Sequence, residues 1–285
     1  MSYDNFEIRK REERACRAIE KYGKTLWHYT DIGALNGIIN TREIWLGSAA
    51  NMNDKEELNG FISDLESEVY KQIGQVNIKE SESVFEKIKR RLTAEYPFIF
   101  CVSRAYDDAA QWERYAQRGQ GVAIVFNTEI LYKLIFYNHF IISEEYYGYN
   151  AKQHEMKNLL VDYILEGKMN AFSDLNGLID NLLLCAMIHK HKSFSAEREV
   201  RISPYFVKEN DSHLQYKVFN TIRRVYIMNL DELCKKEEIV FEDLISSIVL
   251  GPKSQQNIED LKWYFKQVGL PKLSDKISRS NCPLR

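Results

Sequence analysis

The chain has 285 residues, of which 45% are hydrophobic and 28% charged, a balance typical of a globular protein with a sizeable core. Its formal net charge of −2 gives no overall electrostatic reason to bind nucleic acid. No apolar run approaches the roughly 20 residues that a membrane span requires, and the five cysteines form no Cys-X-X-Cys pair. We expect a cytoplasmic protein without a membrane segment, disulfides or a structural metal.

The first part of the chain alternates charged helices with short strands. Apolar residues at three- and four-residue spacing predict helices over 9–21, 54–72 and 80–93. Two short strands, 27–30 and 43–47, are predicted with a helix between them. His28 lies on the first strand and Ser48 follows the second, which predicts a compact polar corner. A lone histidine beside aromatic residues is also typical of ordinary packing.

A nearly continuous apolar run over 98–103 predicts a buried central strand, and 121–126 predicts another. The helix between them carries Trp112 and Tyr115 one turn apart on one face. Such an aromatic pair serves either as core packing or as one wall of a ligand pocket.

Residues 127–195 predict a helical excursion, with one strand over 140–147 and helices over 152–165 and 175–190. No repeat or flexible linker marks a domain boundary. We therefore expect an α+β fold in a single domain, 1–285, with a core of about 24–252 and a helical insertion of about 150–190. The later elements predicted from residue type are strands over 214–219, 224–228 and 245–250 and a last helix over 257–268.

The most informative stretch is Glu197-Arg198-Glu199-Val200-Arg201. On an extended backbone alternate side chains share a face, so both carboxylates and the guanidinium of Arg201 would point the same way. That face is either solvated, as charge runs usually are, or it lines a polar cleft.

Motifs for dinucleotide binding, phosphate loops, zinc proteases and serine hydrolases are absent from the sequence. His189 and His191, two positions apart on a predicted helix, would not face one another, so we expect no metal site. The chemistry must then rest on His28, its polar neighbours and Glu199.

Seven short motifs follow one another along the chain: His28-Tyr29-Thr30, Ser48, Asn53-Asp54-Lys55-Glu56-Glu57, Ser103-Arg104, Trp112-Glu113-Arg114-Tyr115-Ala116, Gly121-Val122-Ala123-Ile124 and Lys192 to Arg201. Their order resembles a bacterial family, the domain of unknown function 2971. The resemblance covers roughly residues 24–252 and departs from the family pattern at Lys55, where the family commonly has proline.

A more distant resemblance is to ADP-ribosyltransferases, whose His…Tyr/Ser…Glu layout is similar to His28, Ser48 and Glu199 here, while Glu197-X-Glu199 looks like the paired glutamates of the arginine-modifying branch. This resemblance implies an ADP-ribosyltransferase-like split sheet, mixed or antiparallel, with peripheral helices. It also implies NAD as substrate and a toxin or phage-defence effector that transfers ADP-ribose to a protein or nucleic acid, or hydrolyses NAD.

Cleavage of the nicotinamide–ribose bond passes through an oxocarbenium-like sugar, which a fixed carboxylate stabilises. Glu199 would supply this carboxylate, Glu197 would orient or deprotonate the acceptor, and His28 would hydrogen-bond a ribose hydroxyl. The residues expected to bind NAD are His28, Tyr29, Thr30, Trp45, Ser48, Arg104, Trp112, Tyr115 and Arg201.

Two alternatives remain open. A metal-dependent nuclease-type effector would need an acidic cluster such as Asp54, Glu57 and Glu199. A non-catalytic interaction domain would instead carry the charged strand as a solvated ladder of ion pairs, with Arg201 simply neutralising Glu199.

Overall fold

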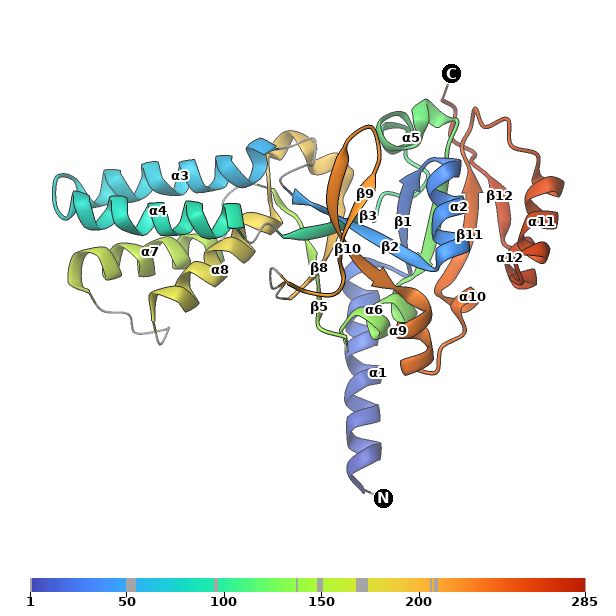
Figure 1. Ribbon diagram of the computed structural model, residues 1–285, viewed down its shortest axis with the longest axis horizontal. Coiled ribbons are helices and arrows are strands. Elements are labelled where there is room, and N and C mark those ends of the chain that lie inside the picture. Colours follow the sequence, from blue (N-terminus) through green and yellow to red (C-terminus); the bar gives the residue numbers. More distant parts are fainter. Residues whose placement is uncertain are drawn as a thin grey trace.

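The computed structural model describes residues 2–49, 55–94, 97–136, 138–147, 151–167, 174–205, 207 and 210–284. It consists of a β-sheet core, a helical arm that projects from one side of the core, and a long N-terminal helix that extends from the core in another direction (Figure 1).

The helices are α1 (Ser2–Tyr22), α2 (Ile32–Thr41), α3 (Lys55–Ile73), α4 (Ile78–Ala94), α5 (Ala109–Tyr115), α6 (Thr128–Phe136), α7 (Ala151–Glu166), α8 (Leu175–Ile188), α9 (Leu230–Lys236), α10 (Phe241–Leu244), α11 (Ile258–Gln267) and α12 (Pro271–Ser274), with 3₁₀ turns η2 (Gln117–Gly119) and η3 (Lys192–Glu197). The strands are β1 (Thr25–Thr30), β2 (Glu43–Ser48), β3 (Phe98–Ser103), β4 (Val122–Asn127), β5 (Phe140–Glu144), β6 (Tyr146–Tyr147), β7 (His189–Lys190), β8 (Glu199–Pro204), β9 (Leu214–Val218), β10 (Ile222–Asn229), β11 (Ile245–Leu250) and β12 (Ile277–Arg279).

The main sheet runs in the order β12-β11-β4-β1-β3-β2-β10-β9, and β8 joins it by pairing with β3 and β5. All pairs are antiparallel except β11 with β12, and a separate small pair of β6 with β7 is also parallel. The expected α+β class with a mixed sheet is therefore confirmed.

Buried strands form where the sequence has continuous apolar runs, because both faces of these strands are covered. The two faces of β1 pack in different apolar clusters. Leu26 belongs to the cluster that includes residues of α2 and α6, whereas Trp27 and Tyr29 belong to the cluster that includes Trp112 of α5. The side chain of Asp31 caps α2 by accepting from the backbone N–H of Ala34 at 2.8 Å.

Strands β1 and β3 diverge. β1 pairs with β4 over its whole length but meets β3 at a single position, Trp27 opposite Ser103. β3 instead pairs with β8 over Phe100–Ser103 and with β2 at Phe98 and Ile99. The sheet therefore opens beside β3.

The helical insertion is larger than the sequence predicted. The predicted insertion, about 150–190, corresponds to α7 and α8, but these helices pack with α3 and α4 around one shared apolar core. The helices predicted as separate scaffold thus complete a four-helix arm (Figure 1). The arm exists because neither amphipathic helix pair can cover its own apolar face.

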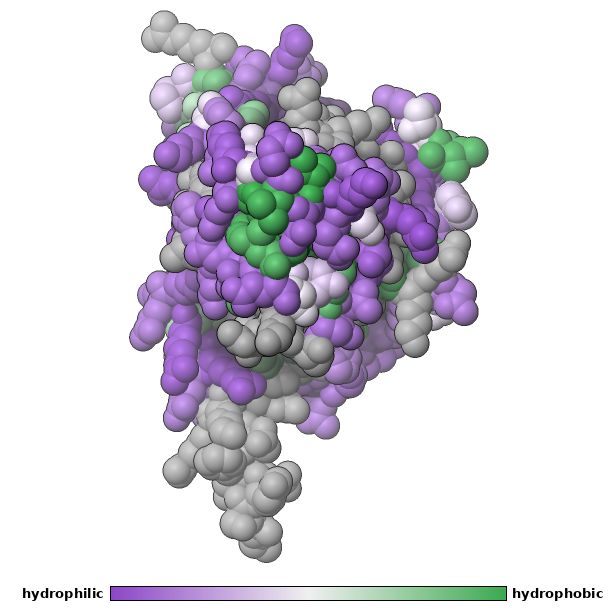
Figure 2. Space-filling view, turned by 90° about the vertical axis from the view of Figure 1, so that its left-hand side faces the viewer, coloured by the Kyte–Doolittle hydropathy of each residue, from purple (hydrophilic) through white to green (hydrophobic). Residues whose placement is uncertain are grey.

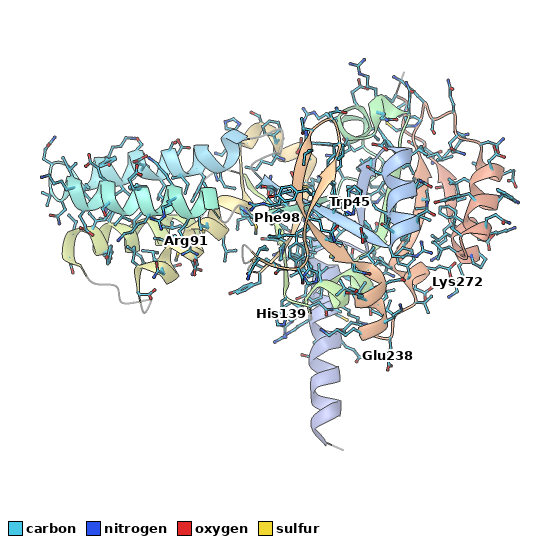
Figure 3. All side chains as sticks on the ribbon, viewed as in Figure 1. Trp45, Arg91, Phe98, His139, Glu238 and Lys272 are labelled. Carbon is cyan, nitrogen blue, oxygen red and sulfur yellow. The ribbon has the colours of Figure 1, made fainter. Side chains whose placement is uncertain are left out.

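Strand β3 links the two cores at the base of the arm. Phe98, labelled at this junction in Figure 3, packs in the sheet core, while the next residue, Ile99, packs in the arm core. At the free end of the arm the surface is mostly hydrophilic around a small apolar patch (Figure 2). Val76, between α3 and α4, and Leu165, near the end of α7, are exposed apolar residues of the arm. No helix in the described part of the chain is both long and apolar enough to cross a membrane.

Candidate functional site

A cavity of about 300 Å³ lies where β1 and β3 diverge. Residues 27–29 of β1 and 101–103 of β3 form two of its sides, and α5 contributes Gln111 and Tyr115. The remaining lining comes from the segment after α8, including Lys190, Phe194, Glu197, Glu199 and Arg201. His28 and Glu199, which are far apart in sequence, therefore share one cavity, as is required if both contribute to the same chemistry.

Glu199 is the first residue of β8 and lies opposite Ser103 of β3. Its side chain is buried, and its two oxygens pair with different cations: Oε1 with Arg201 Nε at 3.1 Å and Oε2 with Lys190 Nζ. Burial alone would raise the pKa of this carboxyl, but Arg201, Lys190 and a hydrogen bond from Cys101 outweigh it and lower the pKa to about 2. Glu199 is thus ionised at neutral pH.

The sequence predicted an extended strand that includes Glu197. This prediction was wrong, because Glu197 belongs to the 3₁₀ turn η3. Arg198 adopts a left-handed conformation, with φ of 46°, between the turn and β8. Glu197 still lines the same cavity, where its carboxylate accepts from Lys190 Nζ at 2.7 Å, Arg114 Nη1 at 2.8 Å and the Tyr115 hydroxyl at 2.9 Å.

Lys190, on β7, is the central residue that sequence reasoning missed. It is only 5% exposed and bridges Glu197 and Glu199. Its local sequence does not single it out, because a lysine between two histidines at a helix end is usually a surface residue.

Arg201 fixes the other side of Glu199. Its Nε also pairs with the buried carboxylate of Glu145, and its Nη1 donates to the carbonyl oxygen of Met187 at 2.5 Å. Glu197, Glu199 and Arg201 are 3%, 7% and 3% exposed, so the interpretation of this charged stretch as a solvated ladder is wrong. The charges instead form a network in which the buried Glu145, Glu197 and Glu199 are balanced by the buried Lys190 and Arg201 and by the half-exposed Arg114.

His28 faces the cavity from the opposite strand. Its Nδ1 lies 2.9 Å from the carbonyl oxygen of Cys101, and since a carbonyl can only accept, Nδ1 carries the proton. Burial lowers the pKa of His28 to about 4, although the Cys101 hydrogen bond and Asp31 act in the other direction. At neutral pH the ring is therefore uncharged, with its acceptor at Nε2.

The expected NAD-binding residues are brought together only in part. His28, Tyr29, Tyr115 and Arg201 line the cavity, but Thr30, Trp45, Ser48, Arg104 and Trp112 do not. Trp112 is fully buried and donates to Asp107 at 2.7 Å, so of the two aromatic residues on α5 one packs and the other faces the cavity.

Two of the remaining positions have partners elsewhere. Trp45, labelled in Figure 3, is partly exposed on β2, where Lys217 Nζ lies 4.6 Å from its ring. Arg104 pairs with Glu144 at 3.0 Å. Neither side chain lines the cavity.

The nuclease alternative requires an acidic cluster such as Asp54, Glu57 and Glu199. Asp54 lies outside the residues that the structure describes, as does the Asn53 of the same motif, and both oxygens of Glu199 contact cations. Within the described ranges no group of three or more His, Cys, Asp or Glu side chains is suited to hold a metal ion.

Residues 111–202, about a third of the chain, match the model of a family described as "Protein of unknown function (DUF2971)". No curated protein and no solved structure matches the chain. The matched segment runs from α5 to β8 and contains Lys190 and both cavity glutamates, but not His28. The match supports the DUF2971 family that the order of the motifs indicated.

Proposed function

We propose that the protein cleaves the nicotinamide–ribose bond of NAD in this cavity and transfers ADP-ribose to an acceptor or to water. One observation carries the proposal: an ionised carboxylate on β8 and a neutral imidazole on β1 line one cavity at the opening of the sheet. A fixed anion beside a ribose is what an oxocarbenium-like transition state requires. The role expected from the resemblance is that of a toxin or defence effector.

In the proposed reaction the bond between C1′ and the nicotinamide nitrogen breaks, and its electron pair leaves with nicotinamide. The carboxylate of Glu199 stabilises the positive charge that develops on C1′ and the ring oxygen. A lone pair of the acceptor, or of water, then forms the new bond to C1′. Glu197 receives the proton that the acceptor loses.

The cavity offers polar groups that suit the nicotinamide riboside part of NAD. Trp27 lines it, and its buried Nε1 has no hydrogen-bond partner among the described residues, so it remains available to a carboxamide oxygen. His28 Nε2 can accept from a ribose hydroxyl, and the rings of Tyr115 and Phe194 are available for stacking. The volume is at the low end for small-molecule sites, which fits part of a dinucleotide better than all of it.

The test is incubation of the purified protein with labelled NAD, with and without cell lysate, followed by separation of protein, nucleic acid and free ADP-ribose. Release of nicotinamide by the wild type and its loss in Glu199→Gln would support the proposal. Glu113→Gln, an exposed glutamate on α5, is the matched control and should release nicotinamide at the wild-type rate.

Two results would contradict the proposal. One is the absence of both nicotinamide release and thermal stabilisation by NAD, since a ligand at about 100 times its dissociation constant adds roughly 2.7 kcal/mol. The other is an activity on nucleic acid that needs no NAD and is abolished by a metal chelator, which would favour the nuclease alternative.

A further inference from the structure

The α7–α8 hairpin of the arm joins the core through two neighbouring segments. The chain enters α7 after β6 and leaves α8 into β7, and these two strands pair in parallel, with Tyr146 opposite His189 and Tyr147 opposite Lys190. The two ends of the hairpin are therefore held side by side next to the cavity. We call them the feet of the hairpin, residues 145–147 and 189–190.

Each foot carries one buried charge, and each charge contacts the network around Glu199. Glu145, in the first foot, pairs with Arg201, and its backbone N–H donates to the carbonyl oxygen of Glu199 at 3.2 Å. Lys190, in the second foot, pairs with Glu197 at 2.7 Å and with Glu199. The carbonyl oxygen of Met187, near the end of α8, accepts from Arg201.

Two carboxylates that converge on one buried point repel each other. Lys190 offsets this repulsion because its ammonium group lies between Oε2 of Glu197 and Oε2 of Glu199. The lysine is itself fixed: it is buried, it is paired through β7, and its ammonium group lies 5.4 Å from the ring centre of Phe194.

We propose that Lys190 is a positioning residue, placed by the α7–α8 hairpin, that holds the carboxylates of Glu197 and Glu199 side by side at the cavity. This proposal rests on the proposed function only in the experiments that measure turnover of NAD. Its structural part holds for any reaction that uses this pair of carboxylates.

The direct test is a pH titration of the Glu199 carboxyl by ¹³C NMR in the wild type and three variants. In Lys190→Met the apparent pKa of Glu199 should rise by about 1–3 pH units, the range for loss of a neighbouring opposite charge. Lys190→Arg should keep it near the wild-type value, because a guanidinium restores the charge. Lys192→Met, an exposed lysine of the same segment, is the matched control and should not change it.

With NAD as substrate, the acid limb of the pH–rate profile should move upward in Lys190→Met by the same amount and return in Lys190→Arg. A purely structural lysine would lower activity without moving this limb. An unchanged titration of Glu199 in folded Lys190→Met would overturn the inference while leaving the proposed function intact. Absence of NAD turnover in the wild type would refute the proposed function, and the NMR titration would still decide the role of Lys190.

Removal of a buried cation can prevent folding, so a double variant completes the test. If Lys190 acts through Glu199, Lys190→Met should lower the denaturation midpoint much less in the Glu199→Gln background than in the wild type. If Lys190→Met alone does not fold, recovery of a folded protein in the double variant would support the pairing. Equal losses in both backgrounds, or no recovery, would overturn it.

Discussion

Replacement of Glu199 by glutamine removes one negative charge from the cavity and keeps the size of the side chain. Burial disfavours this charge, yet Arg201 and Lys190 hold the pKa at about 2, compared with 4.5 for an unperturbed glutamate. A difference of about 2.5 pH units corresponds to roughly 3 kcal/mol of stability at neutral pH. An exposed ion pair would have cost no more than about 1 kcal/mol.

The sign of the pH dependence follows from the lowered pKa. The stabilisation from Glu199 is complete above about pH 4.5, where the unfolded chain is also ionised, and it is lost as the pH falls toward 2. Urea denaturation should therefore show Glu199→Gln to be less stable than the wild type by about 3 kcal/mol at pH 7 and by roughly half as much at pH 3. A deficit that stays constant with pH would refute the electrostatic reasoning.

The same variant tests the chemistry. If Glu199 stabilises the oxocarbenium-like transition state, NAD affinity should change little, while nicotinamide release falls by on the order of 10²-fold or more. Isothermal calorimetry with NAD and a nicotinamide-release assay on the folded variant separate the two effects. Full turnover in folded Glu199→Gln would refute the transferase mechanism.

Three further predictions concern the surroundings of the cavity. Tyr115→Phe removes the hydroxyl that donates to Glu197, and in urea denaturation it should cost about 1 kcal/mol. Gly121→Ala would place a Cβ 2.2 Å from a backbone oxygen and should lower stability by on the order of 3 kcal/mol, whereas Gly37→Ala, with open space around it, should not destabilise the protein in the same assay. His28 should remain uncharged down to about pH 5 in an NMR titration of its ring, and a pKa near 6.5 would contradict its burial.

Local patterns in the sequence predicted most strands and the α+β class. The apolar runs over 98–103, 121–126 and 245–250 correspond to β3, β4 and β11 within one residue, since continuous burial imposes a continuous apolar sequence. Asp31 and Asp108 cap α2 and α5 with their side chains, and sequence can indicate such caps because a cap depends only on a side chain and the next few backbone N–H groups.

The charged stretch at 197–201 could also be selected from sequence alone, since three charges at alternate positions are unusual beside apolar residues. The backbone around it could not be predicted in the same way. Glu197 is the last residue of the 3₁₀ turn η3, and Arg198, in a left-handed conformation, then redirects the chain into β8. Alternation of side chains does not apply across such a turn.

The partners of these charges were decided by the tertiary structure. Lys190 and Glu145 reach the cavity because β6 and β7 pair at the base of the arm, and His28 reaches it because β1 parts from β3. Pairing between distant strands leaves no local signature, and a pKa depends on burial and on neighbours that only the fold supplies. The sequence by itself therefore determined the elements and the charges, while the fold determined which charges meet, and with them the chemistry that the cavity supports.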